Sequence, residues 1–407
     1  MSDLTIELTA MAHGGNALGR DKKGQVVFVP YGIPGERVRV RVPDSKRKFF
    51  HGELIGVEKR SAERVKPTCE HFGECGGCHF QHMAYDTQLA WKRKVVIDQL
   101  NRIGRIKQAK VLAVIPSPEQ YGYQMELSLN RAENGRLGLW SPTQKQVMPI
   151  NKCHIIDPGL QELFEDIDFD LPELRKLTLR RGSDGALLAA LEVEGVEPPS
   201  LLTDFPISVT IVLPDGTAAN LVGDNYFVQT INGHDFRISG GVFCHPNPGV
   251  IPHLIETVQA YAQLTGEERV LELYSGMGML TAFLAPNAGE IIGVEYNEDA
   301  INDAVINLHD WDNVSLYASP VATAIPSLEM NPDVVVADAP LGGLDKAVIR
   351  QLQTWRPRRF VYVSSDVATF ARDAGQLTKQ GYSLREVQPL DMQPQHFQVQ
   401  TVSLWTK

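Results

Sequence analysis

Hydrophobic and polar positions alternate with different periods along the chain, and each change of period predicts a change of secondary structure. RVRVRV at residues 37–42 alternates arginine with valine, which is typical of a strand with one buried face. The apolar run VVFV at 26–29 lies between turns that contain glycine and proline. Several short strands in so short a segment predict a small barrel of the OB type over residues 1–62.

The middle of the chain combines helical and strand patterns. YDTQLAWKRKVVIDQLNRIG, residues 85–104, has apolar positions at helical spacing and ends at a glycine, so we expect an amphipathic helix. Residues 108–237 are rich in strand and turn patterns, as in ISVTIVLPDG. Together with the cysteine-containing segment before the helix, these patterns predict a central α+β domain over residues 63–237.

From about residue 240 the chain alternates strands and helices. RVLELY at 269–274 is typical of a buried strand, and a glycine turn and a helix follow it. EIIGVEYN, DVVVADAP, RRFVYVSS and TVSLWTK predict further strands. This alternation predicts a doubly wound parallel sheet, so residues 238–407 form a Rossmann-like domain.

Composition and charge narrow the class of protein. The chain has 407 residues, of which 43% are hydrophobic, enough for two or three domains with substantial cores. No apolar run has the length of a membrane span and the N-terminus lacks a signal pattern, so we expect a cytoplasmic protein, monomeric and without a membrane partner.

The charge is uneven along the chain. The net charge is −10, yet residues 1–66 contain 13 basic and 8 acidic residues. A basic N-terminal module predicts contact with a polyanion such as RNA, and the alternative is a solvated charged face. DSKRKFF at 44–50 adds a basic loop followed by aromatics, which suits phosphate contact and base stacking.

A nucleotide-type site is predicted where the strand RVLELY meets the glycine turn. Gly276 and Gly278 allow a ligand to approach the backbone, and the helix that follows offers unpaired N–H groups. Glu295 ends the next strand, where a carboxylate can bind ribose hydroxyls. The turn lacks the third glycine of a dinucleotide site and the lysine of a P-loop, which favours S-adenosylmethionine. We assign Tyr274 to the same cofactor site.

The cysteines predict a metal site. Cys69, Cys75 and Cys78 fall within ten residues, and Cys153 is the natural fourth ligand. An odd total of five cysteines with this clustering argues against a disulfide framework. Four thiolates suit either an iron–sulfur cluster or zinc, and the spacing alone does not separate the two.

These motifs together resemble the RNA uracil-5 methyltransferases, which make 5-methyluridine. The resemblance spans nearly the whole chain, and CEHFGECGGCHFQHMAYDTQLAWKRK is its most specific part. It implies an N-terminal TRAM domain, a 4Fe–4S cluster on Cys69, Cys75, Cys78 and Cys153, and a domain that binds S-adenosylmethionine. It also implies structured RNA, tRNA or rRNA, as the substrate.

The chain departs from this family where the family's chemistry takes place. The resemblance implies a cysteine nucleophile that attacks C6 of uracil and a glutamate that later removes the C5 proton. Here SSDV and QPQHFQVQ put Ser365 and Gln400 at those two positions. Asp338 is retained, but Leu341 replaces an arginine three residues later, and His245 replaces a glutamine of the cofactor site.

These replacements predict that the usual reaction is lost or changed. A serine hydroxyl is far less acidic than a thiol, whose pKa is about 8.5, and an amide accepts no proton at neutral pH. One hypothesis is an RNA methyltransferase with another route or another target atom, for which a relocated Cys244 nucleophile is one option. The alternative is a non-catalytic RNA-binding or RNA-folding protein.

Overall fold

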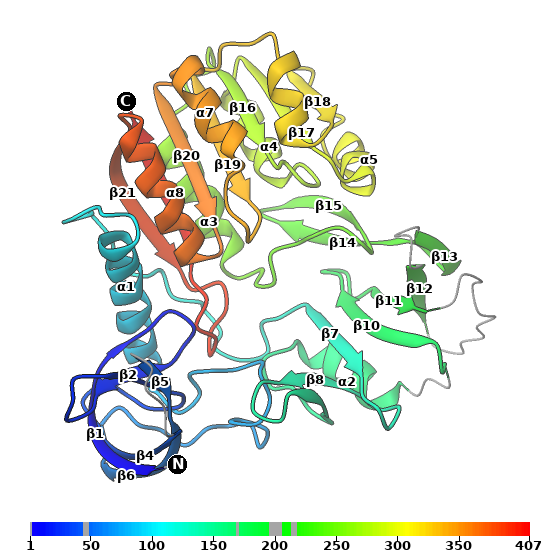
Figure 1. Cartoon of the computed structure of the whole chain (residues 1–407). Coiled ribbons are helices and arrows are strands. Elements are labelled where there is room, and N and C mark those ends of the chain that lie inside the picture. The colour runs from blue at the N-terminus through cyan, green and yellow to red at the C-terminus, as the bar shows by residue number, and fades with distance from the viewer. Residues whose placement is uncertain (1, 44–48, 168–170, 195–205, 213–217) are drawn as a thin grey trace.

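The computed structural model describes residues 2–43, 49–167, 171–194, 206–212 and 218–407. Three larger sheets and a separate β-hairpin account for its strands (Figure 1). Within the described ranges, no helix is long and apolar enough to cross a membrane.

The N-terminal sheet curls into the barrel-like unit seen in blue in Figure 1. Its strand order is β5-β3-β2-β1-β4-β6. In RVRVRV the valines are buried and the arginines point outward, as the alternation predicts. Residues 44–48 of the predicted basic loop lie outside the described residues. The strands are β1 (Ser2–Met11), β2 (Ala17–Arg20), β3 (Val26–Val29), β4 (Arg37–Val42), β5 (Phe49–His51) and β6 (Glu53–Lys59).

The central region contains a seven-stranded, mostly antiparallel sheet of order β13-β12-β11-β10-β7-β8-β9. Helix α2 (Pro158–Asp166) packs on it, and its N-cap Asp157 accepts hydrogen bonds from two backbone N–H groups. The strands are β7 (Glu126–Arg131), β8 (Leu137–Ser141), β9 (Gln146–Pro149), β10 (Leu174–Arg181), β11 (Leu187–Val193), β12 (Ile207–Val212) and β13 (Ala218–Val222), followed by the hairpin β14 (Tyr226–Ile231) and β15 (His234–Ser239).

The C-terminal sheet has the order β18-β17-β16-β19-β20-β22-β21. Strands β16 to β20 are parallel, as predicted, but TVSLWTK forms an antiparallel strand inserted between β20 and β21. The strands are β16 (Arg269–Leu273), β17 (Glu290–Glu295), β18 (Val314–Ala318), β19 (Val334–Ala339), β20 (Arg359–Ser364), β21 (Ser383–Leu390) and β22 (Gln400–Thr406).

Helices cover both faces of this sheet, and their apolar residues form two separate core clusters. One face carries α3 (Ile251–Ala262), α4 (Met279–Leu284) and α5 (Glu298–Asn307). The other face carries α6 (Val321–Ala324), α7 (Lys346–Trp355) and α8 (Val367–Lys379). This two-sided cover explains why the central strands read as continuous apolar runs.

Helix α1 (Tyr85–Arg102) lies beside α8 rather than on the central sheet (Figure 1). Val96 and Leu100 belong to the core of the C-terminal sheet, while Val95 packs into the N-terminal core. A Cβ added to Gly104 would lie 2.9 Å from the carbonyl oxygen of Ala371 in α8, so the close crossing requires glycine. The amphipathic helix is confirmed, and it joins two units of the fold.

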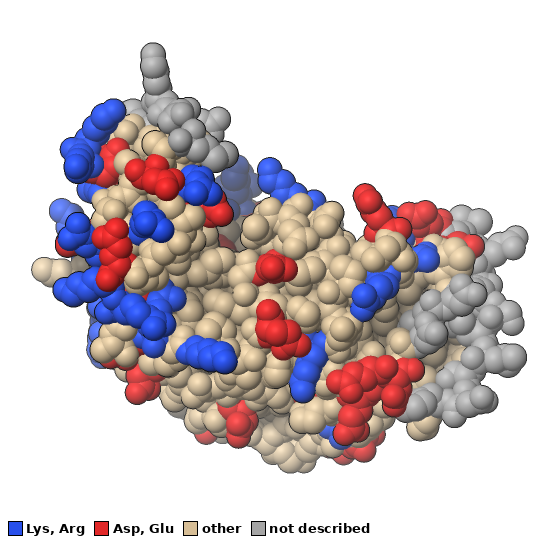
Figure 2. All heavy atoms as spheres, turned by 90° about the horizontal axis from the view of Figure 1, so that it is seen from below, with Lys and Arg blue, Asp and Glu red and all other residues tan. Residues whose placement is uncertain are grey.

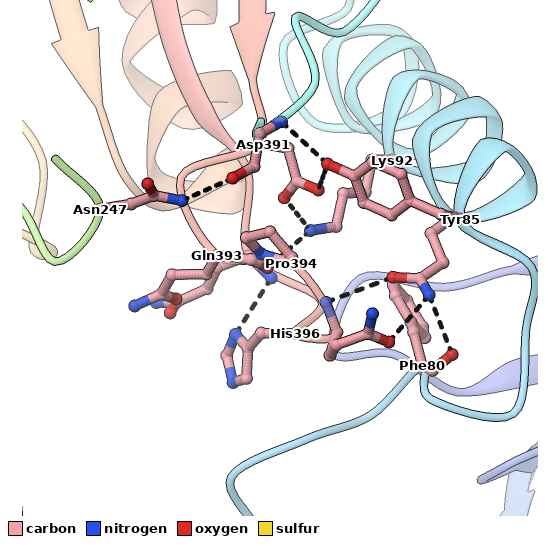
Figure 3. Close-up of polar contacts among 12 residues, drawn as sticks. Phe80, Tyr85, Lys92, Asn247, Asp391, Gln393, Pro394 and His396 are labelled. Carbon is pink, nitrogen blue, oxygen red and sulfur yellow. Dashed lines mark hydrogen bonds and ion pairs between the residues drawn. The ribbon is translucent and has the colours of Figure 1, made fainter. Parts of the chain in front are cut away.

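A buried ion pair fastens α1 to the segment that leads from β21 back to β22 (Figure 3). Lys92 in α1 pairs with the carboxylate of Asp391, and both side chains are fully buried. Tyr85 donates a 2.8 Å hydrogen bond to the other oxygen of Asp391, and the Lys92 amine also donates to the Gln393 carbonyl at 2.9 Å. Burial lowers the pKa of Lys92, and the Asp391 carboxylate opposes that effect.

A second contact holds the middle of the same segment. The Gln88 amide nitrogen in α1 donates to Gln395 Oε1 at 2.9 Å and to the Met83 carbonyl at 2.8 Å. The backbone oxygen of Gln395 accepts from the N–H groups of His79 and Phe80. Segment 391–399 is therefore tied to α1 and to the cysteine-containing segment before it.

Lys92→Met should lower the free energy of unfolding by about 3–5 kcal/mol, because it leaves a buried carboxylate without its cation. Urea denaturation measures the loss. Lys94→Met is the matched control, since Lys94 is exposed and lies over the Trp91 ring; it should lose about 1 kcal/mol or less.

Adding Asp391→Asn to Lys92→Met should restore part of the stability, because no unpaired charge then remains. Equal losses in the Lys92 and Lys94 variants would show that the ion pair contributes nothing.

Candidate functional site

A cavity of about 720 Å³ opens at the carboxyl ends of the parallel strands. Open α/β sheets bind their ligands at this edge, and the volume lies within the range of about 300–1,000 Å³ typical of small-molecule sites. Its lining brings together all the predicted cofactor and catalytic positions except Gly278, which lies just beyond it: His245, Tyr274, Gly276, Glu295, Asp338, Ser365 and Gln400.

The glycine turn after β16 shapes one half of the cavity. Tyr274, Gly276 and Gly278 all have positive φ, at 63°, 56° and 85°. A Cβ on Gly276 would point into open space, whereas one on Gly278 would lie 2.6 Å from a methyl carbon of Leu308. Gly276 thus leaves room for a ligand against the backbone, and Gly278 lets α4 pack closely.

Glu295 is fixed by backbone donors at the end of β17. Its Oε2 accepts from the Gly276 N–H at 3.0 Å, and its Oε1 accepts from the N–H groups of Tyr296 and Asn297. The carboxylate keeps further lone pairs for a ligand hydroxyl. Ser275, which sequence reasoning missed, contributes a buried Oγ without a hydrogen-bond partner in the described structure. This half of the cavity fits the predicted cofactor.

Glu272 is a second cavity residue that sequence reasoning missed. It lies in β16, is fully buried and accepts a 2.6 Å hydrogen bond from the Thr281 hydroxyl. Burial, together with the charges of Asp338 and Glu295, raises its pKa to about 8. The available signal was an acidic residue inside an otherwise apolar strand.

Ser365 and Gln400 face each other in the other half of the cavity. The antiparallel register pairs Ser364 with Thr401. Ser365, one residue after Ser364, therefore comes opposite Gln400, one residue before Thr401. The Ser365 hydroxyl donates to Gln400 Oε1 at 2.8 Å. The Gln400 side chain is buried, and its amide nitrogen has no hydrogen-bond partner among the described residues.

Asp366 is turned away from Ser365 and towards the N-terminal unit. Its carboxylate caps α8 by accepting from the Thr369 N–H at 2.7 Å and lies 3.2 Å from His13 Nε2. Burial raises the pKa of Asp366, but the hydrogen bonds from His13 and Thr369 outweigh it and hold the pKa at about 2. This carboxylate is too weak a base to activate the neighbouring serine.

His245 forms a buried pair with Asp338. The imidazole Nε2 lies 3.0 Å from Asp338 Oδ2, and the two side chains are 5% and 16% exposed. Asp338 comes from β19, and His245 from the segment between β15 and α3. The structure therefore brings the new histidine, a departure from the family pattern, into contact with the retained Asp338.

Two other singled-out positions have simpler environments. Cys244 is partly buried, and this burial raises the pKa of its thiol to about 12, so it is a poor nucleophile. Leu341 is 60% exposed at the cavity mouth, where the resemblance implies an arginine. Together with exposed Phe243 and Tyr296 it makes an apolar rim.

The four clustered cysteines line a separate cavity of about 230 Å³. All four thiols are unpaired and partly buried. Within the described residues, the group whose ligand atoms all lie within 4.8 Å of one another is Cys69, Glu70 and His154, so the four thiols do not converge on one small ion. Their spread around a common cavity fits a multinuclear cluster better than a single zinc ion.

The two cavities share a wall. Gln393 and Gln398 line both of them, and His396 lines the cysteine cavity. Burial, next to His79, holds the pKa of His396 well below its usual range. Segment 391–399, which α1 fastens, thus separates the two sites.

Basic side chains gather on the N-terminal unit, at the left of Figure 2. A group of acidic side chains lies at the lower right of the same view, away from that unit. Exposed basic residues of this unit include Arg37 and Arg39 in β4, Lys59 in β6 and Arg60 directly after β6. The charge asymmetry of the sequence is thus also an asymmetry in space.

The fold and the cavity define an α/β protein with a cavity of small-molecule size at the carboxyl edge of its parallel sheet. Residues 2–55 match the TRAM domain family. An uncharacterized RNA methyltransferase of Thermosynechococcus vestitus is 31% identical over 99% of this chain and 98% of its own length. Another from Porphyromonas gingivalis is 30% identical over 98% of this chain and 99% of its own length.

The chain therefore belongs to the RNA methyltransferase family. Among solved structures, the Pyrococcus abyssi tRNA (uracil-54, C5)-methyltransferase in complex with S-adenosyl-L-homocysteine matches with a TM-score of 0.75 at 23% identity. The match covers 99% of this chain and 100% of that one, so the two share their fold throughout.

Glu272→Gln should change how stability depends on pH. Between about pH 4.5 and 8 the unfolded chain loses the proton that the folded protein keeps, so wild-type stability falls as pH rises. The variant carries no such proton and should gain stability over the wild type by on the order of 1 kcal/mol per pH unit. Urea denaturation at pH 5 and pH 8 measures this.

Glu267→Gln, at an exposed position before β16, is the control and should leave the wild-type pH dependence intact. Parallel stability curves for the wild type and Glu272→Gln would mean that Glu272 is ionised in the folded protein.

Proposed function

We propose that this protein binds S-adenosylmethionine and structured RNA, either tRNA or rRNA, and has lost the covalent route to uracil C5 methylation. This proposal rests mainly on the hydrogen bond that Ser365 donates to Gln400, because these two residues occupy the predicted nucleophile and base positions. The proposal assigns Tyr274, Gly276, Gly278 and Glu295 to the cofactor.

The cavity's first half supports the cofactor assignment. An unpartnered serine hydroxyl, an open glycine and a carboxylate at the strand end surround a space of suitable size. The Pyrococcus abyssi enzyme, which shares the fold, was solved with S-adenosyl-L-homocysteine. When bound, S-adenosylmethionine supplies an electrophilic methyl group.

The N-terminal unit supports the RNA assignment. It matches a TRAM domain and carries exposed basic residues, and its His13 contacts Asp366 next to the cavity. An RNA held on this unit therefore lies close to the cavity. Because basic groups displace counterions from phosphates, RNA affinity should fall as salt rises.

The second half of the cavity argues against the usual reaction. The Ser365 proton is directed to an amide oxygen, and Gln400 accepts no proton at neutral pH. Asp366, with a pKa of about 2, is directed elsewhere. Without a thiolate and a base, the covalent route loses several orders of magnitude in rate.

The retained scaffold with a neutral Ser365–Gln400 pair also favours a second candidate function, a non-catalytic RNA-binding or RNA-folding protein. Such a protein keeps its affinity for RNA and S-adenosylmethionine but transfers no methyl group.

For the cysteine cavity we propose a 4Fe–4S cluster held by Cys69, Cys75, Cys78 and Cys153. Protein purified without oxygen should contain iron and acid-labile sulfide in equal amounts and no stoichiometric zinc, as measured by elemental and sulfide analysis. Cys153→Ser should lower the iron content, whereas Cys244→Ser, outside the cavity, should not. One zinc per chain and no sulfide would overturn the assignment.

Ser365→Cys should form a covalent RNA adduct that the wild type does not. The thiolate can attack C6 and the methyl group can reach C5, but Gln400 cannot remove the C5 proton, so the adduct persists. Denaturing gels after incubation with radiolabelled S-adenosylmethionine and RNA from a deletion strain detect it.

Gln400→Glu in the same chain should release the adduct as 5-methyluridine. Production of 5-methyluridine by the wild type would contradict the proposed loss. Ser364→Cys is the control, since that buried hydroxyl donates to the Asp366 carbonyl and is not part of the cavity lining.

A further inference from the structure

The His245–Asp338 pair has the geometry of a base with an orienting carboxylate. With Nε2 donating to Asp338 Oδ2, the other ring nitrogen, Nδ1, carries a lone pair. No hydrogen bond from a described residue reaches that nitrogen, and the ring lines the cavity. A carboxylate that fixes the tautomer of a histidine in this way prepares it to accept a proton.

We propose that His245, oriented by Asp338, is a general base for direct methylation of an N–H or O–H group of an RNA nucleotide. This inference rests on the proposed function, because it requires RNA and S-adenosylmethionine in the cavity. It names the class of target atom: a nitrogen or oxygen that already has a nucleophilic lone pair and carries a proton.

The other polar groups of the cavity are unsuited to this task. Glu272 is directed to Thr281, and its raised pKa keeps it protonated near neutral pH. Glu295 already accepts three backbone hydrogen bonds on the cofactor side. The Ser365 hydroxyl donates to Gln400 Oε1, and the Gln400 amide accepts no proton at neutral pH.

The backbone around His245 is held firmly. The guanidinium of buried Arg180 donates to the Val242 carbonyl at 2.7 Å, and buried Asn247 donates to the Ser117 hydroxyl at 2.9 Å. The Phe243 ring packs edge-on against the imidazole, with ring centres 5.2 Å apart. Because the residues before and after His245 are held in place, the imidazole loses little conformational entropy when it meets its substrate.

The reaction balances without a covalent adduct. The nitrogen or oxygen takes the methyl group of S-adenosylmethionine, whose sulfur keeps the electron pair of the broken bond. The target's proton passes to Nδ1 of His245 and then to water. Neither an attacking thiolate nor removal of a carbon-bound proton is needed, so the Ser365–Gln400 pair is no obstacle.

The test is methyl transfer from radiolabelled S-adenosylmethionine to total RNA of a deletion strain, with nucleosides identified by mass spectrometry. We expect a nucleoside methylated on nitrogen or oxygen. His245→Gln places the residue that the family pattern carries there and should lower the rate at least about 100-fold. His253→Gln, on an exposed face of α3, is the control and should keep the wild-type rate.

Two further measurements separate catalysis from structure. In His245→Gln, affinity for S-adenosylmethionine by calorimetry and for RNA by filter binding should stay within about threefold of wild type. In His245→Ala, added imidazole should restore part of the rate. Nitrogen-15 NMR of the histidines should show, for the signal missing in His245→Gln, a proton on Nε2 and none on Nδ1 at pH 8.

Each contrary outcome has its own meaning. Failure to bind S-adenosylmethionine or RNA overturns the proposed function and this inference with it. Binding of both without methyl transfer overturns the inference alone and favours the RNA-binding role. A methyl group on uracil C5, a rate unchanged in His245→Gln, or a proton on Nδ1 overturns the role of His245.

Discussion

The buried ion pair between Lys92 and Asp391 is the interaction on which the arrangement of the site depends. It joins residues 299 positions apart, one in the helix that bridges two units and one at the start of segment 391–399. That segment returns the chain to the edge of β20 as an antiparallel strand, and the register then brings Gln400 to Ser365. A buried charge that loses its partner strongly destabilises the folded protein. The Lys92 and Asp391 side chains must therefore stay in contact, which fixes the start of segment 391–399 against α1. The position of an amide in the cavity is thus set by a contact outside it.

Local patterns in the sequence were enough to predict most of the strands and helices, because a period of two or of 3.6 residues shows which side of an element is buried. These patterns could not predict which other element packs against the buried side. The amphipathic pattern of residues 85–102 is the same whether the helix packs on the central sheet or, as it does, beside α8. Nor does an apolar strand such as TVSLWTK reveal its direction, because burial on both faces hides the alternation that would set its register.

The candidate site was predicted as a set of positions, and the structure supplies their pairing. The resemblance to the family was enough to assign Ser365, Gln400, Asp338 and His245 to replaced or retained positions. The contact between His245 and Asp338 joins two elements far apart in the sequence, so no local pattern predicts it. The cap of α8 illustrates the same limit. Asp366 follows Ser365 directly in the sequence, yet its carboxylate contacts His13 and accepts from the Thr369 N–H at the start of α8.

The wall shared by the two cavities has a thermodynamic consequence. Gln393 and Gln398 each present surface to the cysteine cavity and to the larger cavity, so one short segment is in contact with whatever occupies either space. Coupling between two binding equilibria is reciprocal: a change of affinity in one direction requires an equal factor in the other. Any influence of the proposed cluster on affinity for the proposed cofactor must therefore be matched by an influence of that cofactor on the retention of the cluster.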